Sequence, residues 1–362
     1  MGECVLNILF LCGDLNNFGG TERVSSIIAN GLSDSGYSVC MTSILNGDKP
    51  FFPLNDKVKV TSLTNSNARV LYQMPKIIWN LRKLLKDEDI DILIVVDTMS
   101  VLFSIPAVAG LPVKHIGWEH FSFNNNLGKK GRSISRQLAA RYCDSIVTLT
   151  ERDKKYWLQG TRHKSQIMAI ANPCPFPVQE CIEKENTKIV LAVGRLVSQK
   201  GFDMLLEAWV KVTKDAPDWK LKIVGDGKEK NNLHNFIIEN ELTESVEMLG
   251  STDNVKKYYK EAEIFCLSSR YEGFGMVLIE ALAFGLPIVS FDCEAGPEEV
   301  LEGTGSILVP SNNIDLLASA LLDLINDEEL RKTISVKSKD KVEKYHPLQI
   351  VLQWEKLIES LK

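Results

Sequence analysis

The chain has 362 residues, enough for two domains of ordinary size. Apolar residues make up 44% and charged residues 25%, an average soluble composition, and the net charge of -5 gives no reason to expect nucleic-acid binding. The longest apolar runs, such as 92–96, are far too short to span a bilayer, so we expect a globular protein.

Short apolar runs alternate with helix-period segments, a pattern typical of βα units around a parallel sheet. The N-terminus has no basic start, and Glu3 and Asp14 interrupt it, so 6–12 predicts a first strand rather than a signal peptide. The further strands predicted in the first half are 38–44, 92–96, 113–118 and 145–149. The helices predicted between them are 21–34, 72–87, 99–109, 130–142 and 151–158.

The pattern stops at "ANPCPFPVQE" (171–180), where prolines disfavour both helix and strand, and we interpret 171–187 as a linker. The strands predicted beyond it are 188–195, 219–227, 246–250, 263–269, 287–291 and 306–310. The helices predicted there are 201–214, 228–240, 253–260, 276–285, 314–325, 327–344 and 347–361. We expect an α/β protein with two doubly wound domains, 1–170 and 188–345, that bind ligands at the carboxyl ends of their strands.

Eight cysteines are scattered along the chain, and no two have the tight spacing of a zinc site. Several lie inside apolar runs, where cysteine behaves as a small hydrophobic residue. This usage predicts a reducing, cytoplasmic compartment.

The segment "GDLNNFGGTERV" (13–24) directly follows the first predicted strand. Gly19 and Gly20 would let backbone N–H groups approach an anion, and the helix that follows Thr21, the expected N-cap, favours negative charge at its start. An ordinary strand-to-helix turn explains the same residues equally well. The loop matches neither G-x-G-x-x-G nor a P-loop, which argues against dinucleotide oxidoreductases and NTPases.

The segment "VGRLVSQKG" (193–201) opens the second half at the equivalent place. Arg195 lies just beyond a predicted strand, and Lys200 precedes the next helix. Two cations at a strand's carboxyl end suit a diphosphate, because Arg forms forked hydrogen bonds and Lys supplies a point charge. Taken alone, such a pair is more often a solvated surface feature.

The segment "RYEGFGMVLIEALAFGLPIVS" (270–290) places Glu272 before a glycine turn and Glu280 inside the apolar helix that follows. An unpaired carboxylate is costly to bury, so both face either solvent or a ligand rich in hydroxyls. Their separation spans at most about 12 Å, roughly the reach from a nucleotide's ribose to a sugar beyond its diphosphate. The amides of 273–277 would point at such a ligand from a helix N-terminus.

Together these segments resemble glycosyltransferase family 4, a retaining family with the GT-B fold. "EGFGMVLIE" is similar to the family's E-x7-E motif, and the resemblance extends in the expected order through "GGTERV", "VGRL…KG", "GDG" (225–227), "EALAFGLPIVSFD" and "GPEEVL" (296–301). It implies two Rossmann-like domains facing across a cleft: an N-terminal acceptor domain and a C-terminal nucleotide-sugar domain. It also implies that the amphipathic segment 346–362 returns to the N-terminal domain.

The resemblance implies roles for single residues. Glu272 would contact the donor sugar, and Glu280 the ribose. His120, in "GWEHF" (117–121), matches a histidine near the reaction centre, although a lone histidine is more often structural. The implied catalytic residues are Glu272, Arg195, Lys200 and His120. The implied donor-binding residues are Gly19, Gly20, Gly194, Gly225, Gly273, Phe274, Gly275, Met276, Val277 and Glu280.

The implied reaction moves a hexose or N-acetylhexosamine from a UDP-sugar to a glycan acceptor with retention of configuration. The resemblance implies that the departing diphosphate deprotonates the acceptor hydroxyl. No second carboxylate in the motif is an obvious nucleophile, which argues against a double-displacement mechanism. The resemblance implies no metal and no cofactor, because the nucleotide-sugar is a substrate. The stretch "DEDIDI" (87–92) is similar to the D-x-D motif of metal-dependent transferases, but it precedes a strand and is better interpreted as a solvated turn.

Two segments combine basic and apolar residues, "MPKIIWNLRKLLK" (74–86) and "KKGRSISRQLAAR" (129–141). Basic amphipathic helices can dock on anionic lipid, and helices packed on a sheet with solvated charges outward are an equally good interpretation. The basic residues are Lys76, Arg82, Lys83 and Lys86 in the first segment, and Lys129, Lys130, Arg132, Arg136 and Arg141 in the second. From the resemblance we expect a polyprenyl-diphosphate-linked acceptor and peripheral attachment to the inner face of the cytoplasmic membrane.

Three other functions remain open on the same fold. They are a GDP-mannose-dependent mannosyltransferase, a UDP-sugar 2-epimerase and a non-catalytic nucleotide-binding subunit with a decayed site. The joint presence of Glu272, Glu280, Arg195 and Lys200 argues against decay.

Overall fold

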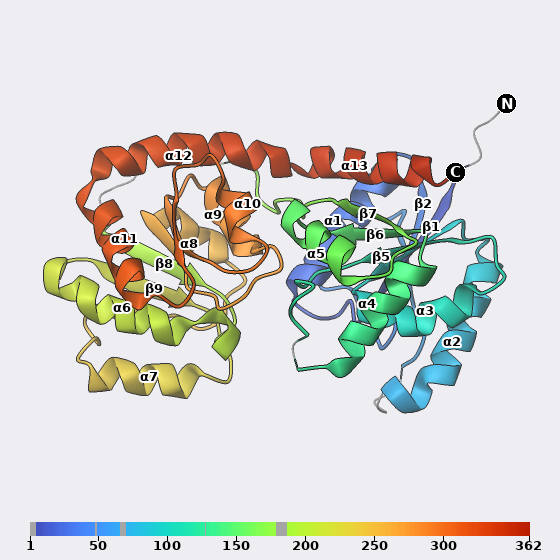
Figure 1. Cartoon of the computed structure of the whole chain (residues 1–362), viewed down its shortest axis with the longest axis horizontal. Coiled ribbons are helices and arrows are strands. Elements are labelled where there is room, and N and C mark those ends of the chain that lie inside the picture. Colours follow the sequence, from blue (N-terminus) through green and yellow to red (C-terminus); the bar gives the residue numbers. More distant parts are fainter. Residues whose placement is uncertain (1–4, 48, 66–69, 127, 179–186) are drawn as a thin grey trace. The chain divides into compact units, whose positions relative to one another are not determined.

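A computed structural model describes residues 5–47, 49–65, 70–126, 128–178 and 187–362. The chain forms two compact units, which we call unit 1 (Met1–Pro175 with His346–Lys362) and unit 2 (Phe176–Tyr345). Each contains one parallel sheet with helices around it (Figure 1). This confirms the α/β class with two doubly wound sheets. Residues 179–186 of the linker predicted at 171–187 lie outside the described residues, which end at 178 and resume at 187.

The sheet of unit 1 has seven strands in the order β3-β2-β1-β4-β5-β6-β7, all paired in parallel. Its central strands are runs of fully buried apolar residues, as expected when helices cover both faces. The strands are β1 (Asn7–Cys12), β2 (Ser38–Ser43), β3 (Lys59–Ser62), β4 (Ile92–Val96), β5 (Lys114–Trp118), β6 (Ser145–Thr148) and β7 (Gln166–Ala169).

The sequence analysis missed β3 and β7, the two edge strands of this sheet. Each has only four residues, and β3 reads Lys-Val-Thr-Ser with no fully buried position. An edge strand pairs on one side only and needs no continuous apolar run. The signal that located the central strands is therefore absent from these two segments.

The helices of unit 1 follow the predicted pattern closely. The segment predicted as one helix at 99–109 begins as a 3-10 turn, where Asp97 accepts a hydrogen bond from the amide of Met99. The helices are α1 (Gly20–Asp34), α2 (Val70–Asp87), η1 (Thr98–Ser100), α3 (Val101–Val108), α4 (Lys130–Tyr142), α5 (Glu151–Gly160) and α13 (Pro347–Ser360).

The C-terminal helix α13 belongs to unit 1 and packs on α1 (Figure 1). Trp354 of α13 is fully buried, with its ring centroid 4.7 Å from that of Trp118 at the end of β5. Gly31 of α1 lies directly against Val351. This helix therefore supports the carboxyl end of β5, which carries His120.

The sheet of unit 2 has six parallel strands in the order β10-β9-β8-β11-β12-β13. The strands are β8 (Ile189–Val193), β9 (Lys220–Val224), β10 (Val246–Met248), β11 (Ile264–Leu267), β12 (Ile288–Asp292) and β13 (Ile307–Pro310). The helices are η2 (Ser198–Lys200), α6 (Phe202–Asp215), α7 (Lys230–Glu239), α8 (Val255–Glu261), α9 (Met276–Ala283), α10 (Pro297–Leu301), α11 (Ile314–Asn326), α12 (Glu328–Val342) and η3 (Glu343–Tyr345). The sequence analysis missed α10, a helix of five residues.

Six of the eight cysteines lie in the described residues, where all six are buried: Cys12, Cys40, Cys143, Cys174, Cys266 and Cys293. Cys4 and Cys181 lie outside the described residues. The buried thiols behave as small hydrophobic residues of the two cores, as predicted.

Gly31→Ala is expected to destabilise unit 1, because the added Cβ would lie 2.4 Å from Cγ2 of Val351. Overpacking of this kind costs about 1–3 kcal/mol and lowers the unfolding midpoint. Val351→Ala in the same chain should restore part of the loss. Gly131→Ala on α4 is the matched control, because its Cβ would meet no atom closer than 3.9 Å. Equal midpoints for the two glycine variants would contradict the packing of α13 on α1.

Candidate active site

The predicted site residues fall into two groups, one in each unit. Unit 2 carries Arg195, Lys200, Glu272, Glu280 and the glycines at 194, 225, 273 and 275, in loops that follow β8, β9 and β11 or within α9. Unit 1 carries Gly19, Gly20 and His120.

Lys200 and Glu272 form an ion pair, with 2.6 Å between Nζ and Oε1. The hydroxyl of Ser269 donates to the same oxygen at 2.6 Å. The side chains of Lys200 and Glu272 are only 15% and 8% exposed, so the pair is largely withdrawn from water. A partly buried pair is screened less by solvent than a surface pair, and losing either partner would leave an uncompensated charge.

Two loops are fastened together around this ion pair. The hydroxyl of Ser268 donates to the carbonyl of Lys200 at 3.0 Å, and the amide of Arg270 donates to the carbonyl of Gln199 at 2.8 Å. The guanidinium of Arg270 pairs with Asp203 at 2.6 Å. These bonds fix the loop after β11 against the segment after β8, so the side chains of Lys200 and Glu272 are held next to each other.

Glycines allow this close approach of backbones. Gly201 has φ +64, and a Cβ there would lie 2.0 Å from the carbonyl oxygen of Ser268. A Cβ on Gly225, at φ +147, would lie 1.9 Å from the carbonyl oxygen of Gly194. Both positions therefore require glycine for packing, whether or not a ligand touches them.

Helix α9 begins at Met276 after Gly275, which caps it in the left-handed conformation at φ +87. Glu280 lies within this apolar helix and is 7% exposed. Its Oε2 accepts a hydrogen bond from the hydroxyl of Tyr259 at 2.9 Å. Tyr259 is itself fully buried and stacks on Phe284, so the Glu280 carboxylate is firmly oriented.

Arg195 differs from Lys200 in being exposed. Among the residues that the structure describes, no carboxylate lies within ion-pair distance of its guanidinium. The carboxyl edge of unit 2 thus presents one solvated cation beside one cation paired with Glu272.

His120 in unit 1 follows β5, and its ring packs against Trp118 at a tilt of 45°, with 4.5 Å between centroids. Burial lowers the pKa of His120 to about 4, with Asp97 opposing and Arg132 adding to that shift. The imidazole is therefore neutral at pH 7. Its Nε2 is buried, and no hydrogen-bond partner for it lies within the described part of the chain.

The backbone at His120 is held by Glu119, whose Oε1 accepts from the amides of His120 and Phe121 at 3.1 and 3.0 Å. Glu119 in turn pairs with Arg136 at 2.8 Å and Arg132 at 3.4 Å. Both arginines are almost completely buried, at 1% and 2% residual exposure. The expectation that Arg132 and Arg136 form a basic surface was wrong, because both guanidinium groups are buried in unit 1 and paired with Glu119.

Gly19 is the N-cap of α1, and the helix begins at Gly20. The prediction of Thr21 as the N-cap was therefore wrong. A Cβ on Gly19 would lie 2.1 Å from Oε2 of Glu22, so the carboxylate of Glu22 lies against the start of this helix. A negative charge is stabilised at that position by the helix dipole.

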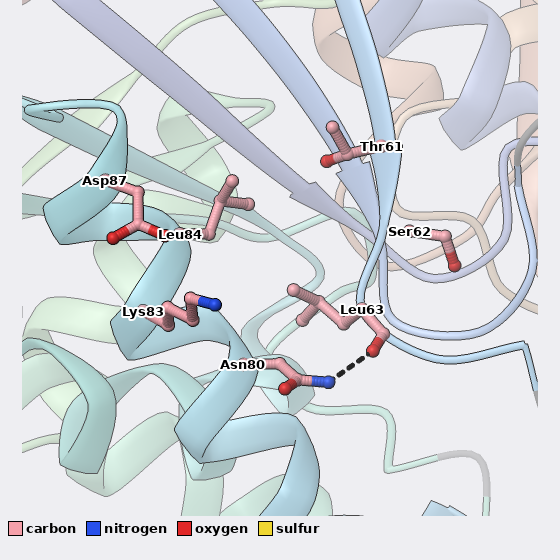
Figure 2. A pocket seen from close by; sticks show the side chains of 7 residues that line it. All are labelled: Thr61, Ser62, Leu63, Asn80, Lys83, Leu84 and Asp87. Atoms are coloured by element: carbon pink, nitrogen blue, oxygen red, sulfur yellow. Dashed lines mark hydrogen bonds between the residues drawn. The ribbon is translucent and has the colours of Figure 1, made fainter.

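A pocket in unit 1 lies between the edge strand β3 and α2 (Figure 2). The side chain of Asn80 donates to the carbonyl of Leu63 across it at 2.6 Å, and Lys83 and Asp87 line it from α2. None of the predicted site residues contributes to this pocket. This pocket is therefore not part of the predicted active site.

No group of three or more His, Cys, Asp or Glu side chains could hold a metal ion within residues 5–47, 49–65, 70–126, 128–178 and 187–362. The absence of a metal and of a cofactor from the reaction stays a prediction.

Sequence reasoning missed Ser269, Tyr259 and Glu119, each of which holds a predicted site residue in place. Serine and tyrosine are too common for their spacing to stand out. Their roles depend on contacts between segments far apart in the chain.

Comparison with known sequences covers both halves of the chain. Residues 18–174 match the family described as Glycosyltransferase Family 4, and residues 179–341 match Glycosyl transferases group 1. An uncharacterized glycosyltransferase of Haemophilus influenzae is 39% identical over 96% of this chain and 99% of its own length. The amylovoran biosynthesis glycosyltransferase AmsD of Erwinia amylovora is 31% identical over 97% and 99%.

A third relative is an α-1,4-N-acetyl-D-galactosaminyltransferase of Campylobacter jejuni, 31% identical over 99% of both chains. Among solved structures, TarM superposes with a TM-score of 0.83 at 16% identity, covering 98% of this chain and 99% of its own. The galactosyltransferase WaaB superposes with a TM-score of 0.77 at 22% identity over the same shares. These similarities confirm the GT-B fold, and the relatives above 30% identity along nearly the whole chain show that it belongs to glycosyltransferase family 4 and is a transferase enzyme.

Proposed function

We propose that this glycosyltransferase moves a hexose or N-acetylhexosamine from a UDP-sugar to a lipid-linked glycan in cell-surface polysaccharide synthesis, with retention. The observation that carries the proposal is the ion pair of Lys200 and Glu272 at the carboxyl edge of unit 2, where the exposed Arg195 follows the same strand, β8, as Lys200. The Campylobacter relative is named for an acceptor linked to undecaprenol through a diphosphate, and AmsD for amylovoran biosynthesis. Structures of the neighbour HepE from Anabaena, at 18% identity, contain UDP.

The arrangement suits a reaction in which negative charge builds on a leaving diphosphate. Arg195 is free to form forked hydrogen bonds with the phosphates, and the amides at the start of α9 add their dipole. Fixed donors aimed at developing charge are usually the largest electrostatic contribution to catalysis. A diphosphate would also attract Lys200 away from Glu272.

Once Lys200 turns to the phosphates, Glu272 gains the capacity to accept hydrogen bonds from the hydroxyls of the donor sugar. Ser269 still holds the carboxylate in place during this exchange. In the same proposal Glu280, oriented by Tyr259, accepts from the ribose hydroxyls. His120 stays neutral, so its ring can offer a hydrogen bond without adding charge.

UDP is expected to raise the unfolding midpoint of the protein with EDTA present throughout. A ligand at 100 times its Kd stabilises the folded state by about 2.7 kcal/mol. Arg195→Ala and Glu280→Gln should each weaken UDP binding about tenfold, the size of one hydrogen bond to a charged group. Arg162→Ala, which removes an exposed arginine of unit 1, is the matched control and should bind UDP like the parent.

The same titration, together with one NMR assay, separates the proposed function from the alternative functions on this fold. A midpoint shift with GDP and none with UDP would move the donor to a GDP-sugar such as GDP-mannose. Conversion of UDP-N-acetylglucosamine into its 2-epimer, followed by NMR, would reveal an epimerase. No shift with any nucleoside diphosphate would contradict the proposed donor site.

The outer stripe of α2 supports a membrane-facing role for unit 1. Tyr72 and Trp79 are 78% and 64% exposed, and Lys76, Lys83 and Lys86 are exposed along the same face. The ammonium of Lys83 lies 5.8 Å from the Trp79 ring centroid. Aromatic rings beside lysines suit the interface of an anionic bilayer.

In the structure, fewer residues of α2 are available to a membrane than the sequence interpretation assumed. Ile77 and Leu81 are buried in the core, and Arg82 donates to the carbonyls of Ala107 and Ala109 at 2.8 Å. Within the described part of the chain, no helix has the length and apolarity needed to cross a bilayer. We propose peripheral attachment to the inner face of the cytoplasmic membrane through the stripe of α2.

Co-sedimentation with vesicles of phosphatidylglycerol and phosphatidylethanolamine measures this attachment. Each lysine near an anionic surface contributes about 1 kcal/mol, so Lys76, Lys83 and Lys86 changed together to Gln should lower partitioning about a hundredfold. Trp79→Ala should weaken binding at every salt concentration. Ile238→Ala, at an exposed apolar position of unit 2, is the control. Absence of binding to these vesicles at low salt would contradict the attachment.

A further inference from the structure

Glu294 lies in the loop that follows β12, next to the loop that carries Glu272. Strands β11 and β12 are paired in parallel, with Leu267 opposite Ser290. Strand β11 ends at Leu267 and β12 at Asp292, and both lead into loops at the same edge of the sheet. Glu294 lies two residues beyond the end of β12, and Glu272 lies five residues beyond the end of β11.

The backbone of Glu294 is held in an unfavourable conformation. Its φ is +41, in the left-handed region that glycine, asparagine and aspartate tolerate best. Gly296, two residues later, lies so close to Phe274 that a Cβ would be 2.2 Å from the Phe274 carbonyl oxygen. The loop after β12 is thus fixed against the glycine turn at 273–275, and strain of this kind is concentrated at ligand sites.

The carboxylate of Glu294 is incompletely satisfied. Its Oε2 is shielded from water, and no hydrogen-bond partner for it lies among the described residues. An acceptor withdrawn from water without a donor is costly, and the cost is larger for a charged group. A ligand that brings a hydroxyl or amide N–H would remove that cost.

The charges around Cys293 show that Glu294 shares a neighbourhood with the ion pair. Burial is the largest cause that raises the pKa of the Cys293 thiol. The charge of Glu272 raises this pKa further, and the charge of Lys200 lowers it. Asp292 and Glu294 then add smaller increases. Glu294, Glu272 and Lys200 therefore all act on one buried atom.

The order of the strands indicates which part of the donor Glu294 would meet. Along the carboxyl edge the order is β9, β8, β11, β12, so Lys200 follows β8, Glu272 follows β11 and Glu294 follows β12. A diphosphate held by the cations after β8 places the next group of the ligand toward β11 and β12. A carboxylate repels phosphate and attracts hydroxyl and amide hydrogens, so it suits the sugar rather than the nucleotide.

We infer that Glu294 is a specificity-determining residue, which accepts a hydrogen bond from a hydroxyl or the acetamido N–H of the donor sugar. The inference rests on the proposed UDP-sugar function. It assigns the sugar end of the donor to the space between the loops after β11 and β12.

Calorimetric titration of UDP, UDP-glucose, UDP-galactose, UDP-N-acetylglucosamine and UDP-N-acetylgalactosamine tests the inference. Glu294→Asn tolerates the left-handed backbone and shortens the side chain, and it should weaken the best-bound UDP-sugar about tenfold or more. Glu294→Gln keeps the length without the charge and should show a smaller loss. UDP itself should bind both variants within about twofold of the parent, because it lacks the sugar. Glu302→Asn is the control, because Glu302 is an exposed residue of unit 2 that is not among the predicted site residues. This variant should bind every ligand like the parent.

Three results would overturn the assignment. Equal weakening of UDP and UDP-sugar would show that Glu294 shapes the whole loop, and unchanged UDP-sugar binding would show that it touches no sugar. A parent protein that binds none of the five ligands would overturn the proposed function and this inference together. Unfolding midpoints equal to the parent's establish that each variant is folded.

Discussion

The ion pair between Lys200 and Glu272 is the interaction on which the proposed chemistry depends. It joins two loops that leave neighbouring strands, β8 and β11, at the carboxyl edge of unit 2. Hydrogen bonds between those loops hold the two charges at 2.6 Å, and glycine at 201 permits the approach. The two loops are thus fixed to each other, so in the proposed reaction only the Lys200 side chain has to turn toward the diphosphate.

Unit 1 uses buried charge in a different way. Glu119 and Asp97 together neutralise Arg132 and Arg136, and Arg136 also donates to the carbonyls of Ser122 and Phe123 at 2.9 and 2.6 Å. Every one of these bonds fixes the loop after β5, so His120 is positioned by a rigid, internally neutral network. The buried charges around His120 stabilise structure, whereas we propose that Lys200 in unit 2 exchanges its partner Glu272 for a diphosphate.

Sequence patterns predicted what depends on local spacing. The buried strands β1 and β4 were located by their apolar runs. Lys200 and Glu272 were selected by their positions after predicted strands and Glu280 by its position in the apolar helix that follows, and their roles stay predictions. Patterns failed where a distant partner decides the outcome. Arg132 and Arg136 have the spacing of a solvated helix face, and only the fold brings Glu119 to them. Tyr259 and Ser269 carry no local signal, because their partners are set by packing between helices and loops.

The UDP affinity and the transfer rate of Glu272→Gln, measured on the same preparation, test the central claim most directly. The substitution releases Lys200 from its partner, so UDP affinity is expected to stay the same or to rise. The rate of sugar release from the UDP-sugar that the parent uses should fall about a hundredfold or more, the effect of losing one transition-state contact. A parallel loss of UDP affinity and rate would contradict the account, because it would show that Glu272 only maintains the loop.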